Sequence, residues 1–187
     1  MTDPPRLPSD GVLRLRPLMP DDAAAQVDGE DDHMVRWLSG GRSTREQQRA
    51  YLASAARAWS QRQRAFDLGI ARVDGGTLIG VVGIQSDMSY LEPGDVNLTY
   101  GLYAPWRGQG LATRAVALAI DVAIKRFDPE RLVIRVDPAN EPSAAVAQRL
   151  GFCYWCNTTD EDDGEGEIDW YVRSPEPGGG NRRPALE

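Results

Sequence analysis

The segment YGLYAPWRGQGLAT, residues 100–113, decides the fold predicted for this chain of 187 residues. Its first residues have the pattern of a strand, Pro105 ends that strand, and Gly108 and Gly110 allow a tight turn into an apolar-periodic helix. The free amides and the dipole of a helix start favour a phosphate group. Arg107 adds a permanent cation with a forked set of donors. The segment therefore predicts an anion-binding turn.

Two common phosphate motifs do not fit this turn. A dinucleotide fingerprint needs a third glycine or an alanine at position 113, where this chain has Thr113, and the Gly-Lys-Ser/Thr of a P-loop is absent. We therefore interpret the turn as a pyrophosphate site of another kind, which disfavours a generic nucleotide-binding domain. The alternative is a strand-to-helix turn that binds nothing.

Two motifs in the chain resemble those of the GNAT superfamily of N-acetyltransferases. Arg107-x-x-Gly110-x-Ala112 is similar to the signature Arg/Gln-x-x-Gly-x-Gly/Ala, whose turn binds the pyrophosphate of acetyl-coenzyme A (acetyl-CoA). The segment 140–152, NEPSAAVAQRLGF, resembles the Asn-x-x-Ser…Leu-Gly-Phe segment of one branch. That branch contains the ribosomal-protein alanine N-acetyltransferases and some antibiotic acetyltransferases. The resemblance spans about residues 11–173.

Periodicity and turn residues predict an α+β fold. We expect strands at 12–16, 66–73, 77–85, 95–103, 131–136, 152–156 and 168–172, and helices at 21–27, 43–62, 110–127 and 142–150. The long helix between the fourth and fifth strands makes them parallel, with a right-handed crossover. The resemblance implies a GNAT-like, mixed, mostly antiparallel and twisted sheet of about seven strands, whose fourth and fifth strands splay apart, flanked by about four helices.

The domain organisation follows from length and composition. A chain of this length forms one domain, which we place at 11–173. Residues 1–10 are predicted to be a flexible lead-in, and residues 174–187 a flexible tail. Seven carboxylates between 157 and 169 predict a solvated loop, with a role in binding a cationic substrate as the alternative.

The resemblance implies a set of cofactor-binding residues. Exposed backbone groups around Leu102 and Tyr103 would pair with the pantetheine arm, and a backbone amide there would polarise the thioester carbonyl. The complete set is Leu102, Tyr103, Arg107, Gly108, Gln109, Gly110, Leu111, Ala112, Thr113, Asn140 and Ser143. Asn140 and Ser143 are also the catalytic candidates, because Ser143 could protonate the departing thiolate. Their alternatives are a turn residue ahead of a helix and a residue that satisfies helix amides.

Two departures from the family pattern leave the acid and the base open. Many members have a tyrosine where this chain has Ala147, so that Ser143 is the remaining candidate for the acid. Relatives often have a glutamate where this chain has Asn97, which cannot accept a proton at neutral pH. The candidates that could replace it as the base are Glu92, Asp95, Asp137, Glu141 and His33. For His33, the alternative is a surface residue without a catalytic role.

Composition limits the partners and the location. A net charge of −7 argues against nucleic-acid binding and is compatible with a cationic amine substrate. No run approaches the ~18 apolar residues of a membrane span, and the N-terminus lacks a signal-peptide pattern, so we expect a cytoplasmic protein that binds no membrane. Cys153 and Cys156 have no second pair with which to complete a metal site, and no metal is expected.

Together these observations predict an enzyme that transfers an acetyl group from acetyl-CoA to a primary amine. The amine is a peptide N-terminus or a small amine such as an aminoglycoside, and it attacks the thioester directly in a ternary complex. A non-catalytic module that binds acyl-CoA is one alternative, motivated by the missing glutamate and tyrosine. A longer donor such as succinyl-CoA is another. A homodimer is an open alternative to a monomer, because dimers are frequent among the resembled proteins.

Overall fold

The computed structural model describes residues 7–160 and 166–176. In this part of the chain one sheet contains seven strands in the order β1-β2-β3-β4-β5-β7-β6. The strands are β1 (Leu13–Pro17), β2 (Ala65–Arg72), β3 (Leu78–Ser86), β4 (Asp95–Leu102), β5 (Arg131–Val136), β6 (Cys153–Asp160) and β7 (Gly166–Arg173). Only β4 and β5 pair in parallel, as their helical connection predicts. The mixed, mostly antiparallel sheet confirms the predicted fold class.

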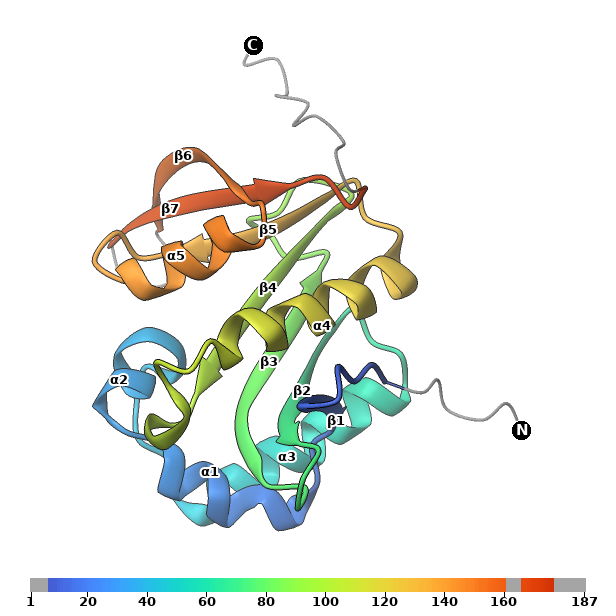
Figure 1. Ribbon diagram of the computed structural model, residues 1–187, viewed down its shortest axis with the longest axis vertical. Coiled ribbons are helices and arrows are strands. Elements are labelled where there is room, and N and C mark those ends of the chain that lie inside the picture. The colour runs from blue at the N-terminus through green and yellow to red at the C-terminus, as the bar shows by residue number, and fades with distance from the viewer. Residues whose placement is uncertain (1–6, 161–165, 177–187) are drawn as a thin grey trace.

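Helices cover both faces of the sheet (Figure 1). They are α1 (Ala23–Gly29), α2 (Asp32–Met34), α3 (Arg45–Ser60), α4 (Leu111–Phe127) and α5 (Glu141–Arg149). The short segments η1 (Pro20–Asp22), η2 (Val35–Ser39), a π-helix, and η3 (Ala104–Trp106) complete the set in the described residues. Helix α4 runs across one face of β1–β4, whereas α1 and α3 lie together on the other (Figure 1).

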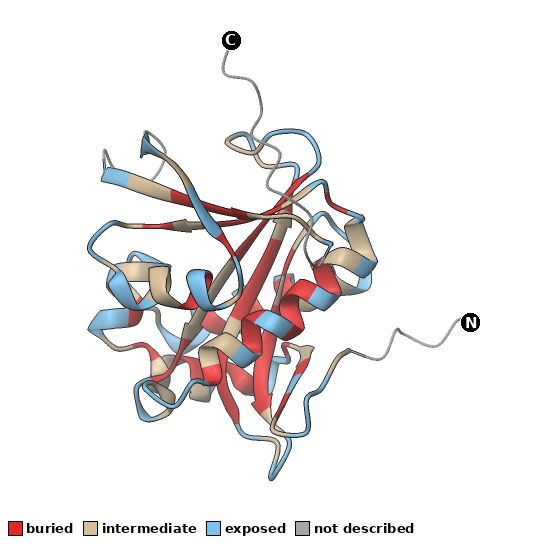
Figure 2. Ribbon diagram, turned by 45° about the horizontal axis from the view of Figure 1, so that its top comes forward, coloured by how far each residue is buried: buried red, intermediate tan, exposed pale blue. Residues whose placement is uncertain are grey.

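The main core lies between α4 and the sheet. Ala115, Val116 and Ala119 of α4 are fully buried, and small side chains at these positions let the helix lie close to the strands. The buried residues follow the strands and the inner side of α4 (Figure 2). A smaller cluster on the opposite face includes Leu52 and Ala55 of α3. The hydrophobic stripes predicted for both helices therefore position them against the sheet.

Strands β4 and β5 pair over a short distance and then diverge. Their register couples Asp95 with Arg131, Val96 with Leu132 and Asn97 with Val133, and ends there among the described residues. Beyond this point β5, β7 and β6 form a separate wing of the sheet, with α5 beside it (Figure 1). The splay implied by the resemblance is thus present, and it begins at Leu98.

Some local predictions were wrong by a residue or more. The helix predicted to begin at residue 43 begins at Arg45, with Thr44 as its N-cap: the Thr44 hydroxyl accepts from the Gln47 amide at 3.2 Å, and the Gln47 side chain accepts from the Thr44 amide at 2.8 Å. Ser43 instead donates its amide to the Glu30 carboxylate at 2.6 Å. The buried side chain of Glu30 therefore competes for Ser43, and this long-range contact is not visible in the local sequence.

Strands β6 and β7 are longer than predicted. They include residues 157–160 and 166–169 of the segment expected to be an acidic loop, while the predicted loop residues 161–165 lie outside the described residues. The same holds for residues 1–6 of the predicted lead-in and 177–187 of the predicted tail. The carbonyl of Pro8 accepts from the Leu15 amide at 3.1 Å, so residues just before 11 pair with β1. Within the described ranges, no helix combines the length and the apolar character that crossing a membrane requires.

Candidate acyl-CoA site

The start of α4 presents backbone amides without a side-chain cap. Gly108 and Gly110 both have φ of 72°, a left-handed conformation that glycine adopts without strain. Gly110 is the N-cap of α4, and no side chain in the described chain caps this end. The first intrahelical bond runs from the Arg114 amide to the Gly110 carbonyl at 3.4 Å, which leaves the preceding amides for another acceptor. This geometry fits a pyrophosphate.

The turn is shaped by its own residues. Gln109 donates from its side chain to the Pro105 carbonyl at 2.9 Å and closes the loop between η3 and α4. Side chains added at Gly108 or Gly110 would meet no atom within 4 Å. Both glycines are therefore required by the backbone conformation rather than by crowding.

The side chain of Arg107 is bonded to other residues of the chain. Its guanidinium donates from Nη1 and Nη2 to the two carboxylate oxygens of Asp31, at 2.6 and 2.8 Å, and its Nε donates to the Leu102 carbonyl at 2.7 Å. The hydrogen bonds from Arg107 hold the pKa of Asp31 well below its usual range. Arg107 thus connects the start of α2 with the end of β4, and the first amides of α4 have no side-chain cap among the described residues.

The open edge of β4 begins at Leu98, before Leu102 and Tyr103, which we expected to pair with the pantetheine arm. The Tyr103 amide donates to the Ile79 carbonyl at 2.9 Å, so it is not available to a pantetheine arm. Antiparallel neighbours exchange bonds at every second residue, and the register with β3 therefore turns the backbone groups of Leu98, Tyr100 and Leu102 toward the diverging strand β5. The Leu102 carbonyl already accepts from Arg107, which leaves its amide. The edge suited to an added pantetheine strand is thus Leu98–Leu102.

A pair of hydroxyl groups bridges the divergence. The Tyr100 hydroxyl lies 2.8 Å from Ser143 Oγ and donates toward the Ser143 carbonyl at 3.1 Å. Burial raises the pKa of Tyr100 to about 12, so this phenol remains protonated at neutral pH. Ser143 therefore points its hydroxyl at β4 rather than at the amides of its own helix. The sequence singled out Ser143 but not its partner, because the two residues are 43 positions apart.

Asn140 is the N-cap of α5. Its side-chain oxygen accepts from the Ser143 amide at 3.3 Å, which orients the first turn of the helix. Asn140 thus lies in the turn ahead of the helix, the alternative considered for this residue, and as the N-cap it places Ser143 at the start of α5.

The residues considered as substitutes for the missing base are dispersed. Asp95 is almost fully buried and forms two hydrogen bonds with Arg131, at 2.8 and 2.7 Å. Asp137 accepts from the Ala139 amide at 2.7 Å in the turn before α5. His33 is exposed near Trp37, and partial burial and Arg107 lower its pKa. Glu141 is exposed in the first turn of α5.

Asn97 occupies the position of the family's glutamate but forms a buried polar contact. Its side-chain nitrogen donates to Gln85 Oε1 at 3.0 Å, and the Tyr90 hydroxyl donates to the same oxygen at 3.0 Å. An amide in this network is a donor and cannot serve as a base. The base that would act on the acceptor amine is therefore not Asn97.

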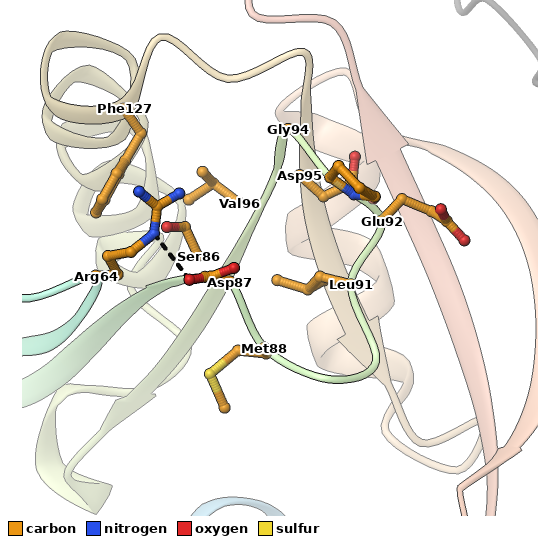
Figure 3. Close-up of a pocket in the computed structure, with 11 residues that line it drawn as sticks. Arg64, Ser86, Asp87, Met88, Leu91, Glu92, Gly94, Asp95, Val96 and Phe127 are labelled. Carbon is orange, nitrogen blue, oxygen red and sulfur yellow. Dashed lines mark ion pairs between the residues drawn. The ribbon is translucent and has the colours of Figure 1, made fainter.

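A pocket of about 210 Å³ lies at the far end of β4 (Figure 3). It is lined by Arg64, Asp87, Glu92 and Asp95 among others, and Arg64 and Asp87 form an ion pair at 3.3 Å. Asp95 and Leu102 are seven residue steps apart along the extended strand, a distance of about 23 Å. Glu92 and Asp95 therefore belong to a different region from the α4 turn. Among the described residues, no cluster of His, Cys, Asp and Glu could hold a metal ion.

The fold and the site define a class of protein. A parallel strand pair that diverges, an open β4 edge and an uncapped helix start after β4 together make a site for an extended ligand that ends in a pyrophosphate. This is the site of an acyl-CoA-dependent transferase. A family model, described as an acetyltransferase (GNAT) domain, matches residues 13–153. The chain belongs to the GNAT family and is an acetyl-CoA-dependent acetyltransferase.

Solved structures agree with this fold. RimL, described as a ribosomal L7/L12 alpha-N-protein acetyltransferase in complex with coenzyme A, is 20% identical with a TM-score of 0.75, covering 90% of this chain and 97% of that one. The ribosomal-protein-S5-alanine acetyltransferase from Vibrio fischeri is 22% identical with a TM-score of 0.72, covering 88% and 93%. The microcin C7 self-immunity acetyltransferase MccE, in complex with acetyl-CoA and AMP, is 17% identical with a TM-score of 0.74, covering 89% and 93%. Comparison with curated protein sequences found no match.

Proposed function

We propose that this protein transfers the acetyl group of acetyl-CoA to a primary amine by direct attack in a ternary complex. The acceptor is a peptide N-terminus or a small cationic amine. The observation that supports this most is the uncapped start of α4 directly after an open strand edge, because one extended thioester ligand can use both. Structural neighbours described as ribosomal-protein acetyltransferases, one of them as an alpha-N-protein acetyltransferase, favour a peptide acceptor.

The chain's own residues can bind and orient the two substrates. Amides of Leu111, Ala112 and Thr113 receive the pyrophosphate, and the backbone of Leu98–Leu102 pairs with the pantetheine arm. Acetyl-CoA supplies an activated acetyl group as a thioester. A backbone amide on this edge of β4 polarises the thioester carbonyl, which favours the charge that develops on its oxygen.

Ser143 is positioned to complete the proton transfers. When the amine nitrogen bonds to the acetyl carbon, the carbon–sulfur bond breaks and coenzyme A leaves as a thiolate. The Ser143 hydroxyl gives its proton to that sulfur, and the bound nitrogen, which must lose a proton to become an amide, replaces it. Tyr100, hydrogen-bonded to Ser143 at 2.8 Å, keeps the hydroxyl oriented and remains neutral.

The test is a turnover assay with detection of free thiol. Acetyl-CoA is offered together with peptides that begin with alanine or serine and with kanamycin, and thiol release is compared with a sample that lacks the amine. Release that depends on the amine, with an acetylated product seen by mass spectrometry, supports the proposal. Binding of coenzyme A without release over the whole panel would instead identify a non-catalytic acyl-CoA-binding module. Succinyl-CoA in a parallel assay tests the length of the acyl group.

A further inference from the structure

An acidic side chain that the sequence did not single out lies on the sheet face opposite α4. Asp67 of β2 is in register with Gly83 of β3, and Gly83 is in register with Thr99 of β4. The three residues form a row across three strands, on the face that α1 and α3 partly cover. Asp67 and Thr99 are half-buried, so the row is not sealed by the helices.

The glycine in the middle of the row brings the two polar side chains together. A Cβ on Gly83 would lie 2.7 Å from Asp67 Oδ1 and 2.4 Å from Thr99 Oγ1. Asp67 Oδ1 and Thr99 Oγ1 therefore both lie over Gly83, close to the same position. Asp67 Oδ1 is above β3, roughly one strand spacing, about 5 Å, from the backbone of β4. An acceptor amine that lies over β4 on this face, between Asp67 and a thioester at the open edge of β4, is therefore within reach of Asp67 directly or through one water molecule.

The charge of Asp67 is not compensated by a cation of the protein. Its Oδ2 accepts from the Tyr51 hydroxyl at 2.7 Å, and no ion pair in the described residues includes it. In contrast, Asp22, Asp31 and Asp95 each receive two hydrogen bonds from an arginine. Burial raises the pKa of the Asp67 carboxyl, and the Tyr51 hydrogen bond opposes that shift only in part.

The charged and titratable groups around Asp67 do not compensate its negative charge. Tyr51 faces Asp67 from α3, and burial, Asp67 and Tyr103 all raise the pKa of the Tyr51 hydroxyl. Arg16 of β1 lies on the same face, 3.7 Å from the Cβ position of Gly69, but it already pairs with Asp22 at 2.6 Å. A half-buried carboxylate with a hydroxyl partner and no cation is suited to receive a cation from a ligand.

We propose that Asp67 binds the ammonium group of the acceptor and then accepts a proton from it. Tyr51 and Thr99 position the Asp67 carboxylate and the ammonium group. This inference rests on the function proposed above and names the base that Asn97 cannot be. The ammonium gives one proton to the Asp67 carboxylate, directly or through water, and becomes a neutral amine. Its lone pair then forms the nitrogen–carbon bond while the carbon–sulfur bond breaks, and Asp67 releases its proton to solvent after the product leaves.

The test combines kinetics with cofactor binding. The amine of the panel with the highest wild-type turnover is used for steady-state kinetics of Asp67→Asn, Asp67→Glu and, as a matched control, Asp121→Asn on the exposed side of α4. We expect Asp67→Asn to lower kcat/KM for the amine at least 100-fold, because general bases contribute about 10²–10⁴. Asp67→Glu should restore part of the rate, and Asp121→Asn should match the wild type.

Two further readouts separate catalysis from structure. The Kd for coenzyme A, measured by calorimetry, should stay within about twofold in Asp67→Asn, because the α4 turn is untouched. Gly83→Ala tests the geometry with the charge retained: the new methyl group displaces the ends of the Asp67 and Thr99 side chains, and kcat should fall at least tenfold with coenzyme A binding preserved. The acid limb of the wild-type profile of kcat/KM against pH should disappear in Asp67→Asn.

The outcomes distinguish this inference from the function on which it rests. An active wild type with an Asp67→Asn variant of similar kcat/KM would overturn the role of Asp67 and leave the acetyltransferase proposal intact. A wild type that acetylates no amine in the panel would overturn the proposed function and, with it, the role of Asp67.

Discussion

The guanidinium of Arg107 donates a hydrogen bond to each carboxylate oxygen of Asp31, with Nη1–Oδ2 and Nη2–Oδ1 distances of 2.6 and 2.8 Å. Asp31 is also the N-cap of α2 and accepts from the Met34 amide at 3.0 Å. One ion pair therefore connects the turn before α4 with a helix on the opposite face of the sheet. The position of the turn before α4 and that of α2 therefore depend on each other.

Replacing Asp31 with asparagine should lower the stability of the protein at neutral pH. Because both side chains are partly exposed, we expect a loss of about 1 kcal/mol in the free energy of unfolding. The pKa of Asp31 is depressed in the folded state, so its contribution is present above about pH 4 and is lost as the pH falls. Urea unfolding at pH 7 and pH 3.5 measures both effects. Asp32→Asn, in the exposed pair with Arg42, is the control and should change stability little.

Removing the Ser143 hydroxyl should slow the chemical step without weakening cofactor binding. For Ser143→Ala we expect kcat to fall about 100-fold, because the thiolate loses its proton donor, while the Kd for coenzyme A changes little. Tyr100→Phe should have a smaller effect on kcat, since it removes only the partner that orients Ser143. Ser60→Ala, at the exposed end of α3, controls for a serine without this environment. Equal kcat values in Ser143→Ala and the wild type would contradict the assignment.

The charged Asp67 carboxylate should lower the free energy of unfolding at pH 8, although catalysis uses it. Its pKa is raised in the folded state, so the folded protein holds the proton more readily than the unfolded chain. The stability linked to this proton is complete below about pH 4 and is lost as the pH rises through the folded-state pKa. Asp67→Asn keeps an acceptor for Tyr51, and at pH 8 it should unfold at the same or a higher urea concentration than the wild type.

The advantage of Asp67→Asn over the wild type should shrink as the pH falls toward 4, because the raised pKa favours protonation of Asp67 in the folded protein. A loss of more than about 1 kcal/mol at pH 8 would show that the carboxylate has a stabilising partner in the folded protein. Asp121→Asn serves again as the control, because its side chain is exposed on α4.

Asp95 should behave in the opposite way. It is buried against Arg131, and removing one member of a buried pair typically costs 3–5 kcal/mol because the other charge stays unpaired. Asp95→Asn should therefore lower the free energy of unfolding by about 3 kcal/mol. At a temperature where the variant remains folded, its kcat should be within about threefold of the wild type, since no step above uses Asp95. A much lower kcat in the folded variant would reinstate Asp95 as a base.

The sequence was most informative where short-range chemistry determines structure. Gly108, Gly110 and Pro105 predicted the strand, turn and helix in their correct order, because left-handed φ values and proline restrict the backbone locally. The parallel pairing of β4 and β5 followed from the length of their connection. The place of Asn140 in the turn ahead of the helix was among the alternatives considered, but its role as the N-cap was not.

Contacts between distant segments could not be predicted in this way. Arg107 and Asp31 are 76 residues apart, so the partner of the arginine was unknown. Asp67 reads as one polar residue in an apolar strand, and only the registers of β2, β3 and β4 place it beside Thr99. In a regular strand Cys153 and Cys156, which are three residues apart, would lie on opposite faces. An irregularity between Tyr154 and Cys156 pairs them with Val172 and Trp170, which share a face.

The central claim is that the start of α4 binds the pyrophosphate of acetyl-CoA, and titration calorimetry with coenzyme A tests it most directly. The informative pair of variants is Gly110→Val and Gly11→Val, because both glycines are exposed, have left-handed φ values and have no atom within 4 Å of an added Cβ. We predict that the wild type and Gly11→Val bind coenzyme A with the same Kd, and that Gly110→Val binds at least tenfold more weakly. A wild type without measurable affinity, or a Gly110→Val variant with the wild-type Kd, would contradict the account.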